Sequence, residues 1–236
     1  MHPPSTDTPT RPTGSRAALV AAALCVPSLL LLLLVALEWH PLLSLDGDIA
    51  RTTHRWAVED PTTTRVSRIL TDWVWDPWAM RALVAVAVIW LALRGAWWLA
   101  LWITGACAAG SALQQGLKAA VDRPRPSWPD PVDSAHFAAF PSGHSMTAMV
   151  VCGLLLWLLR THGAGPVLWR TALTLAVISV AGVGLTRIWL GVHWPSDVLG
   201  GWLLGALTVA VAIATYTYGP GRRATSDPGG RVTDGT

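Results

Sequence analysis

Residues 118–144 read KAAVDRPRPSWPDPVDSAHFAAFPSGH, and long apolar segments flank this stretch on both sides. It gathers cationic and imidazole side chains among prolines, namely Lys118, Arg123, Arg125, His136 and His144. A segment this cationic cannot lie in hydrocarbon, so it must face water or an anion. A second polar cluster, residues 186–197 (TRIWLGVHWPSD), also separates two apolar segments. We therefore expect the two clusters to meet at one face of a membrane.

The composition is that of a membrane protein. Hydrophobic residues make up 52% of the 236 and charged residues only 13%, against about 25% charged in soluble domains. The net charge of +3 is spread along the chain, which does not favour nucleic acid as a partner. Cys25, Cys107 and Cys152 all fall in apolar segments, so we interpret them as packed side chains rather than disulfide partners or metal ligands.

Six apolar segments are candidates for membrane spans. Residues 17–37 carry no charge, and at about 1.5 Å per residue they can cross a hydrocarbon core of roughly 30 Å. A cleaved signal peptide is the alternative, but its apolar region is typically about 7–15 residues long. The other segments are residues 77–93, 96–117, 145–159, 167–185 and 198–217. The pattern predicts an all-α integral membrane bundle of six transmembrane helices.

The remaining segments set the expected domain organisation. Residues 38–76 mix apolar and charged side chains, which predicts short interfacial helices between the first two spans. Residues 1–16 and 218–236 are polar and rich in Pro, Thr, Ser or Gly, so we expect disordered tails around one membrane domain at 17–217.

Charge distribution predicts the orientation in the membrane. Six spans place both termini on one side, where eight basic residues face only three acidic ones. By the positive-inside rule we expect cytoplasmic termini and outward-facing polar clusters. An Ala-, Arg- and Trp-rich chain with a single Lys is typical of a GC-rich bacterial genome, so we expect a bacterial plasma membrane.

Three cations lie at span ends on the same predicted face: Lys118, Arg125 and Arg187. Each alone is explained by a side chain that extends to the membrane interface. Together, and beside two histidines, they suit a phosphate group, because guanidinium groups match its oxygens with paired hydrogen bonds.

Pro141-Ser142-Gly143-His144 precedes the fourth apolar segment. The structural interpretation is a helix start with Ser142 as its cap. The free N–H groups of such a start also form an anion site, which Gly143 would let a ligand approach closely. His144 adds a proton donor with a suitable pKa.

His193 and Asp197 are four residues apart, with Pro195 between them. Asp197 could simply offset the dipole of the helix that follows. The functional interpretation is that its carboxylate accepts a hydrogen bond from His193, which leaves the other imidazole nitrogen as a free lone pair aimed at phosphorus. His144, His193 and Asp197 are also metal-ligand types, but the surrounding cations would repel a divalent ion. We therefore predict no metal and no cofactor.

These residues form three ordered motifs, and through them the chain resembles the type 2 phosphatidic acid phosphatase superfamily of integral membrane lipid phosphatases. K-x6-R-P corresponds to Lys118 with Arg125-Pro126, while Arg123-Pro124 lies two residues too early and is taken as a decoy. P-S-G-H is unchanged at 141–144, and S-R-x5-H-x3-D matches from Thr186 to Asp197 with Thr in place of Ser. The resemblance covers about residues 20–215.

The resemblance implies a metal-independent lipid phosphatase. His193 would be the nucleophile that forms a phosphohistidine, His144 the acid for the leaving group, and Asp197 the residue that orients His193. The phosphoryl oxygens would be held by Lys118, Arg125, Arg187, Ser142 and Gly143. Expected substrates are undecaprenyl pyrophosphate, phosphatidylglycerol phosphate and phosphatidic acid. The alternatives are a lipid phosphotransferase that uses the same histidine and a silent membrane protein that only binds lipid phosphates.

Overall fold

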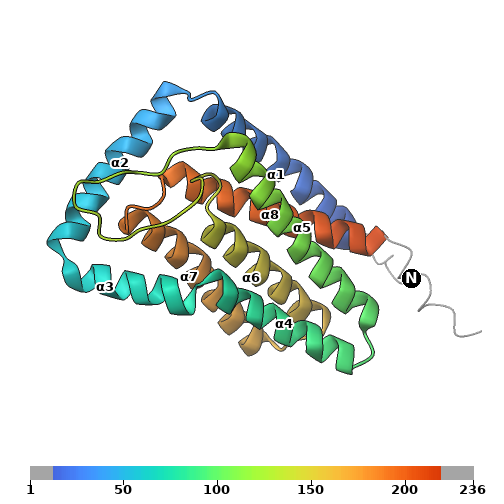
Figure 1. Cartoon of the computed structure of the whole chain (residues 1–236). Helices are drawn as coiled ribbons and strands as arrows, with labels where there is room; N and C mark the ends of the chain where they lie inside the picture. Colours follow the sequence, from blue (N-terminus) through green and yellow to red (C-terminus); the bar gives the residue numbers. More distant parts are fainter. Residues whose placement is uncertain (1–12, 219–236) are drawn as a thin grey trace, which may run out of the picture.

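The computed structural model of the chain describes residues 13–218, which are helical apart from short connections and one long loop. In chain order the elements are α1 (Thr13–Ala36), α2 (His40–Glu59), α3 (Pro61–Ile69), the π-helical η1 (Leu70–Val74), α4 (Pro77–Leu93), α5 (Trp97–Val121), α6 (Gly143–Thr161), α7 (Pro166–Trp189) and α8 (Pro195–Tyr218). The predicted all-α bundle is confirmed (Figure 1). Residues 13–16 of the predicted N-terminal tail belong to α1, and the tails at 1–12 and 219–236 lie outside the described residues.

Within residues 13–218, five helical stretches are long and apolar enough to cross a membrane: residues 14–36, 61–93, 143–161, 166–189 and 195–218. The remaining predicted span, 96–117, lies in α5, which packs against α4, α6 and α8 in the same bundle (Figure 1). Its second half carries Gln114 and Gln115 among small residues, which lowers the hydropathy of this helix. Large apolar side chains such as Leu29, Val86 and Leu101 lie exposed on the outer faces, as lipid-facing positions require.

The interior divides into two apolar clusters. The larger joins α4, α5, α6 and α7 around the fully buried side chains Leu91, Ile103, Leu154 and Val183. The smaller lies where α1 runs along α8 and includes Leu31, Val35 and Phe140. The smaller cluster, through Phe140, Met146 and Leu204, packs the start of α6 against α8.

α6 and α8 approach each other through glycines of α8. A Cβ added at Gly201 would lie 2.8 Å from the carbonyl oxygen of Ser142 and 2.9 Å from the Cβ of Ser145. Such small-residue contacts let two helix backbones pack closely. The first turn of α6 therefore rests directly on α8.

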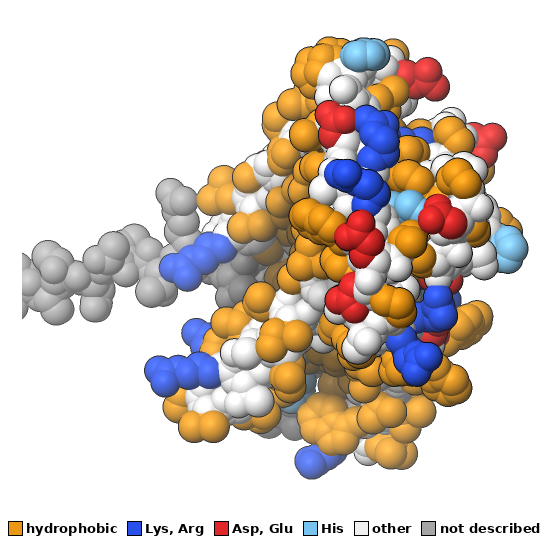
Figure 2. All heavy atoms as spheres, turned by 90° about the vertical axis from the view of Figure 1, so that its left-hand side faces the viewer, with side chains coloured by type: hydrophobic (Ala, Val, Ile, Leu, Met, Phe, Trp, Pro, Cys, Tyr) orange, Lys and Arg blue, Asp and Glu red, His pale blue; other side chains and the backbone are white. Residues whose placement is uncertain are grey.

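α2 and α3 lie across the end of the bundle, on the left of Figure 1, and connect α1 to α4. Their outer face carries a band of charged side chains (Figure 2), to which Asp48, Arg51, Arg55, Glu59, Arg65 and Arg68 contribute. α3 and the following η1 hydrogen-bond to α7: Trp189 Nε1 donates to Thr64 Oγ1 at 3.0 Å, and the hydroxyls of Thr71 and Thr186 lie 2.6 Å apart. The predicted interfacial helices are present, and the first is longer than expected at 20 residues.

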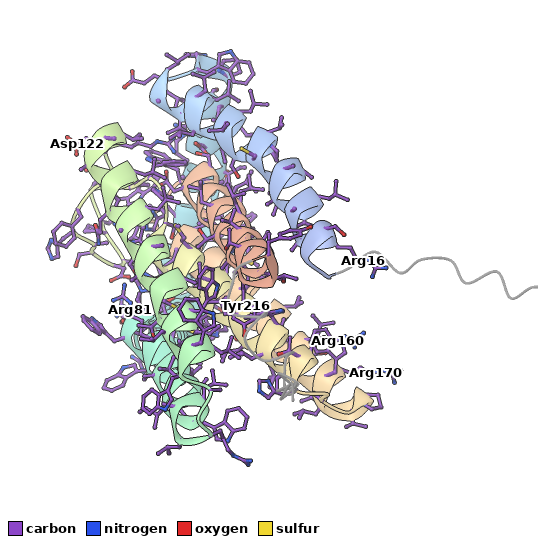
Figure 3. All side chains as sticks on the ribbon, turned by 90° about the vertical axis from the view of Figure 1, so that its right-hand side faces the viewer. Arg16, Arg81, Asp122, Arg160, Arg170 and Tyr216 are labelled. Atoms are coloured by element: carbon purple, nitrogen blue, oxygen red, sulfur yellow. The ribbon has the colours of Figure 1, made fainter. Side chains whose placement is uncertain are left out.

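The two ends of the bundle differ in chemistry. Arg16, Arg160 and Arg170 lie at one end, and Asp122, which begins the loop 122–142, lies at the other (Figure 3). That loop (yellow-green in Figure 1) runs past α2 before it enters α6. Both polar clusters of the sequence therefore lie at the end away from these arginines.

The close packing of α6 on α8 predicts a strong effect of one added methyl group. Gly201→Ala forces backbone atoms of α6 to move, so it should lower the free energy of unfolding in detergent by about 1–3 kcal/mol. Gly116→Ala is the matched control, because an added Cβ there meets nothing within 4 Å. Thermal and denaturant unfolding followed by circular dichroism measure both, and equal stability of the two variants would contradict the packing argument.

Candidate active site

The two polar clusters meet where the loop 122–142, the start of α6 and the junction of α7 with α8 come together. The backbone N–H of Ser142 donates to the carbonyl oxygen of Asp197 at 2.9 Å, and the N–H of Ala139 donates to Arg123 at 2.8 Å. The first of these bonds joins segments that are more than fifty residues apart in the chain. The site is thus assembled by backbone contacts and not by side chains alone.

His193 and Asp197 form the pair that their spacing predicts. His193 Nδ1 lies 3.3 Å from Asp197 Oδ2, and the N–H of Trp194 donates to the same oxygen at 2.8 Å. Pro195 begins α8, so His193 precedes the helix while Asp197 lies in its first turn. Gly191, at φ +67°, lets the chain turn between α7 and His193.

The hydrogen bonds of His193 assign its tautomer. Arg125 Nη1 lies 3.1 Å from His193 Nε2, and a guanidinium group can only donate. Nε2 therefore accepts and carries the lone pair, while Nδ1 carries the proton and donates to Asp197.

The imidazole of His193 is kept neutral by its surroundings. His193 is only 1% exposed, and this burial lowers its pKa well below the ordinary value, with further lowering from Arg125, Arg187 and Lys118. All three predicted cations are therefore close enough to act on His193. A neutral imidazole with its lone pair on Nε2 is the form that can act as a nucleophile.

Backbone carbonyls of the loop hold two of the cations in place. Arg125 donates from Nε to the carbonyl of Phe137 at 2.8 Å and from Nη2 to that of His136 at 3.0 Å. Its Nη1 donates to the carbonyl of Val192 at 2.6 Å, and Lys118 Nζ donates to that of Ala138. Both charges are therefore fixed without an ion pair to a carboxylate of residues 13–218.

Arg187 is the least satisfied cation of the site. It is 5% exposed, and its Nε is buried without a hydrogen-bond partner among residues 13–218. Its only ion pair in that part of the chain is with Asp133 Oδ2, 3.8 Å from Nη1. A buried guanidinium with unused donors indicates an anionic ligand, since leaving such a donor unpaired is costly.

The start of α6 adds backbone donors and a second histidine. α6 begins at Gly143, and its first N–H groups lack helical acceptors. Ser142 is the N-cap residue of α6, as expected, but its side chain makes no capping hydrogen bond, since its hydroxyl accepts from Ser145 Oγ at 3.1 Å. His144 lies within electrostatic range of Arg187, His193, Arg125 and Lys118, so all the predicted site residues are brought together.

Arg123, taken as a decoy from its motif position, is part of the buried site. It is 8% exposed, and it donates from Nη1 to Asp197 Oδ1 and from Nη2 to Asp46 Oδ2, both at 2.7 Å. The repeated R-P dipeptide was a signal that this loop holds two arginines with roles. Asp46 in α2 had no such signal.

A metal centre has no obvious ligands here. Over the described residues 13–218, no group of three or more His, Cys, Asp or Glu side chains could hold an ion together. The prediction that the chemistry needs no metal stays a prediction.

Comparisons with known proteins point to one family. The model of the PAP2 superfamily matches residues 97–220. Phosphatidylglycerophosphatase B of Bacillus subtilis is 39% identical over 99 residues, which cover 40% of this chain and 47% of that protein. The undecaprenyl-diphosphatase of Sulfolobus acidocaldarius is 33% identical over 92 residues, 39% of this chain and 38% of that protein. Each match thus spans less than half the length of the relative.

One solved structure shares the fold over most of the chain. It is the crystal structure of a transmembrane PAP2 type phosphatidylglycerolphosphate phosphatase from Bacillus subtilis, with a TM-score of 0.68 and 24% sequence identity. The likeness covers 86% of this chain and 97% of that one. The helical arrangement is therefore shared well beyond the region of sequence similarity.

The unsatisfied cations predict binding of inorganic phosphate. Titrated phosphate should raise the thermal stability of the purified protein, by about 2.7 kcal/mol at a hundredfold excess over Kd. Arg187→Gln should lose most of this stabilisation, because it removes the buried donors. Arg170→Gln, exposed at the opposite end of the bundle (Figure 3), should keep it. Equal phosphate responses of the two variants would exclude Arg187 from the anion site.

Proposed function

This chain belongs to the PAP2 superfamily, and on that premise we propose that it is an integral membrane phosphatase acting on lipid phosphates or pyrophosphates. The observation that carries the proposal is the neutral, buried His193, whose Nε2 lone pair lies beside Arg125, a cation that forms no ion pair among the described residues. A protein that only binds lipid phosphate would need the cations but neither this lone pair nor Asp197 behind it. The names of the relatives, phosphatidylglycerophosphatase B and undecaprenyl-diphosphatase, support the same class of reaction.

In the first step His193 Nε2 attacks phosphorus and forms an N–P bond. Lys118, Arg125, Arg187 and the N–H groups at the start of α6 hold the phosphoryl oxygens and stabilise the charge that develops on them. Arg125 first exchanges its hydrogen bond to Nε2 for one to a phosphoryl oxygen. This exchange is needed because the hydrogen bond from Arg125 and the attack on phosphorus use the same lone pair of Nε2. The P–O bond to the lipid breaks with its electron pair on oxygen, and His144 supplies the proton, which it carries once the negative charge of the bound phosphate offsets the surrounding cations. Asp197 stabilises the positive charge on His193 through Nδ1.

In the second step water cleaves the phosphohistidine. His144, now neutral, accepts a proton from the water as its oxygen bonds to phosphorus. The N–P bond breaks, its electron pair returns to Nε2, and inorganic phosphate leaves. Both histidines then regain their starting forms, so the cycle needs no metal or cofactor.

Lipid phosphates suit the position of the site at one end of a membrane bundle. There a headgroup phosphate meets the cations while its chains stay in the bilayer. Undecaprenyl pyrophosphate, phosphatidylglycerol phosphate and phosphatidic acid are the candidate substrates. With the termini cytoplasmic, as the arginines at their end of the bundle favour, the site faces outward from a bacterial plasma membrane.

Phosphate release by the detergent-purified protein tests the proposal directly. With excess EDTA, the wild type should release phosphate from at least one of the three candidate lipids, and His193→Ala should release none. The ranking of the lipids would identify the substrate. Release that survives His193→Ala would mean another nucleophile, and transfer of phosphate to an added alcohol without net hydrolysis would mean a phosphotransferase.

The role of His144 as an acid predicts a dependence on the leaving group. His144→Ala should lower the rate on a lipid phosphate roughly 10²–10⁴-fold. On nitrophenyl phosphate the loss should be much smaller, because that leaving group departs without a proton. His162→Ala, at the opposite end of the same helix, is the control and should leave both rates unchanged. Equal losses on the two substrates would rule out proton donation by His144.

A further inference from the structure

We propose that Asp46 and Arg123 are positioning residues of this reaction, which set the orientation of Asp197 and through it that of His193. The inference rests on the proposed function and adds two residues outside the motif positions of the family. Neither would touch the substrate. Both would act through a chain of buried ion pairs that begins in α2 and ends at the imidazole.

The contacts run without a break from α2 to the site. Asp46 Oδ2 accepts from Arg123 Nη2 at 2.7 Å, and Asp197 Oδ1 accepts from Arg123 Nη1 at 2.7 Å. The other oxygen of Asp197 accepts from the N–H of Trp194 and faces His193 Nδ1. The two carboxylate oxygens of Asp197 therefore have separate tasks, one toward Arg123 and one toward His193.

Asp46 also holds the helix that carries Asp197. Its Oδ1 accepts the N–H of Ser196 at 2.9 Å, and its Oδ2 accepts the Ser196 hydroxyl at 2.5 Å. Ser196 lies in the first turn of α8, where N–H groups lack helical acceptors and a negative charge is favourable. The Asp46 carboxylate of α2 thus accepts a backbone hydrogen bond at the start of α8, which is the function that an N-cap residue next to the helix usually has.

Burial makes this chain of contacts rigid. Asp46 is 2% exposed, Arg123 8% and Asp197 0%, and a buried charge is tolerated only when paired and hydrogen-bonded. Arg123 meets both carboxylates at once because its planar group offers several donors in a fixed geometry, which a lysine cannot reproduce.

Loss of either residue would therefore free Asp197 to rotate. Without Arg123, Oδ1 has no partner among the contacts of the described chain, and the carboxylate can turn about its Cβ–Cγ bond. Oδ2 then no longer fixes the proton on Nδ1 of His193. The phosphate-holding cations Lys118, Arg125 and Arg187 keep their own contacts. The expected signature is a loss of turnover with little loss of substrate binding.

Asp46→Asn tests the inference against a matched control in the same helix. Asp48 is exposed and pairs with Arg51 on the surface, so Asp48→Asn should match the wild type. Asp46→Asn should lower kcat on the preferred lipid about 10- to 100-fold. Its KM should stay within about threefold, and stabilisation by inorganic phosphate should be retained. Unchanged kcat, or a loss confined to KM and phosphate binding, would overturn the positioning role.

A double-mutant cycle separates positioning from general stability. In an Asp197→Ala background, Asp46→Asn should cost less than about a further twofold in kcat, because the group it orients is gone. A repeat of the full single-mutant loss would show that Asp46 acts elsewhere. If Asp46→Asn does not fold, Arg123→Lys takes its place, with the same expected loss and the same cycle. A wild type that releases no phosphate would overturn the proposed function and this inference together, whereas an active wild type insensitive to these changes overturns the inference alone.

Discussion

The buried carboxylate of Asp197 is the constraint on which the site depends. Its oxygens receive Arg123 and Trp194 and face His193, while its backbone carbonyl receives the N–H of Ser142. One residue at the start of α8 thus connects the loop 122–142, the start of α6 and the α7–α8 junction. An ionised carboxylate in a dry interior is stable only with such partners. The fold and the chemistry of the site therefore both require that Asp197 keep these contacts.

The second constraint is an excess of positive charge around His193. Arg125 and Lys118 rest on carbonyl oxygens, and Arg187 meets one carboxylate only at 3.8 Å. Asp197 does not offset them fully, since it is already paired with Arg123. This imbalance has two effects at once: it favours an anionic ligand, and it adds to the effect of burial, which lowers the pKa of His193 and keeps its imidazole neutral. Binding of a phosphate would relieve the repulsion and bring the nucleophile to its target.

Local patterns in the sequence predicted most of the fold and the residues that meet at the site. Uncharged segments of about 20 residues identify spans because hydrocarbon excludes charge. Residues only four apart in the sequence, such as His193 and Asp197, stay close together in the folded chain. The contacts of Asp46 could not be predicted, because it lies 77 residues from Arg123 and 150 from Ser196. Nothing local separates it from Asp48, two positions along the same amphipathic helix. Motif spacing also misassigns Arg123, because it selects arginines by position, whereas burial and hydrogen-bond partners decide their roles.

The energetics of the buried ion pairs explain why α2 and α3 lie across this end of the bundle. Removing two carboxylates and a guanidinium from water costs several kcal/mol per ion, and well-packed apolar residues would often stabilise a fold as much or more. The contacts of Asp46 and Arg123 are therefore poorly explained as a source of stability. They are well explained as a means of orientation, since hydrogen-bonded charges fix direction where apolar contacts do not. On this argument α2, which supplies Asp46, helps to position the site. The helices that follow it, α3 and η1, are held against α7 by the Thr64–Trp189 and Thr71–Thr186 hydrogen bonds.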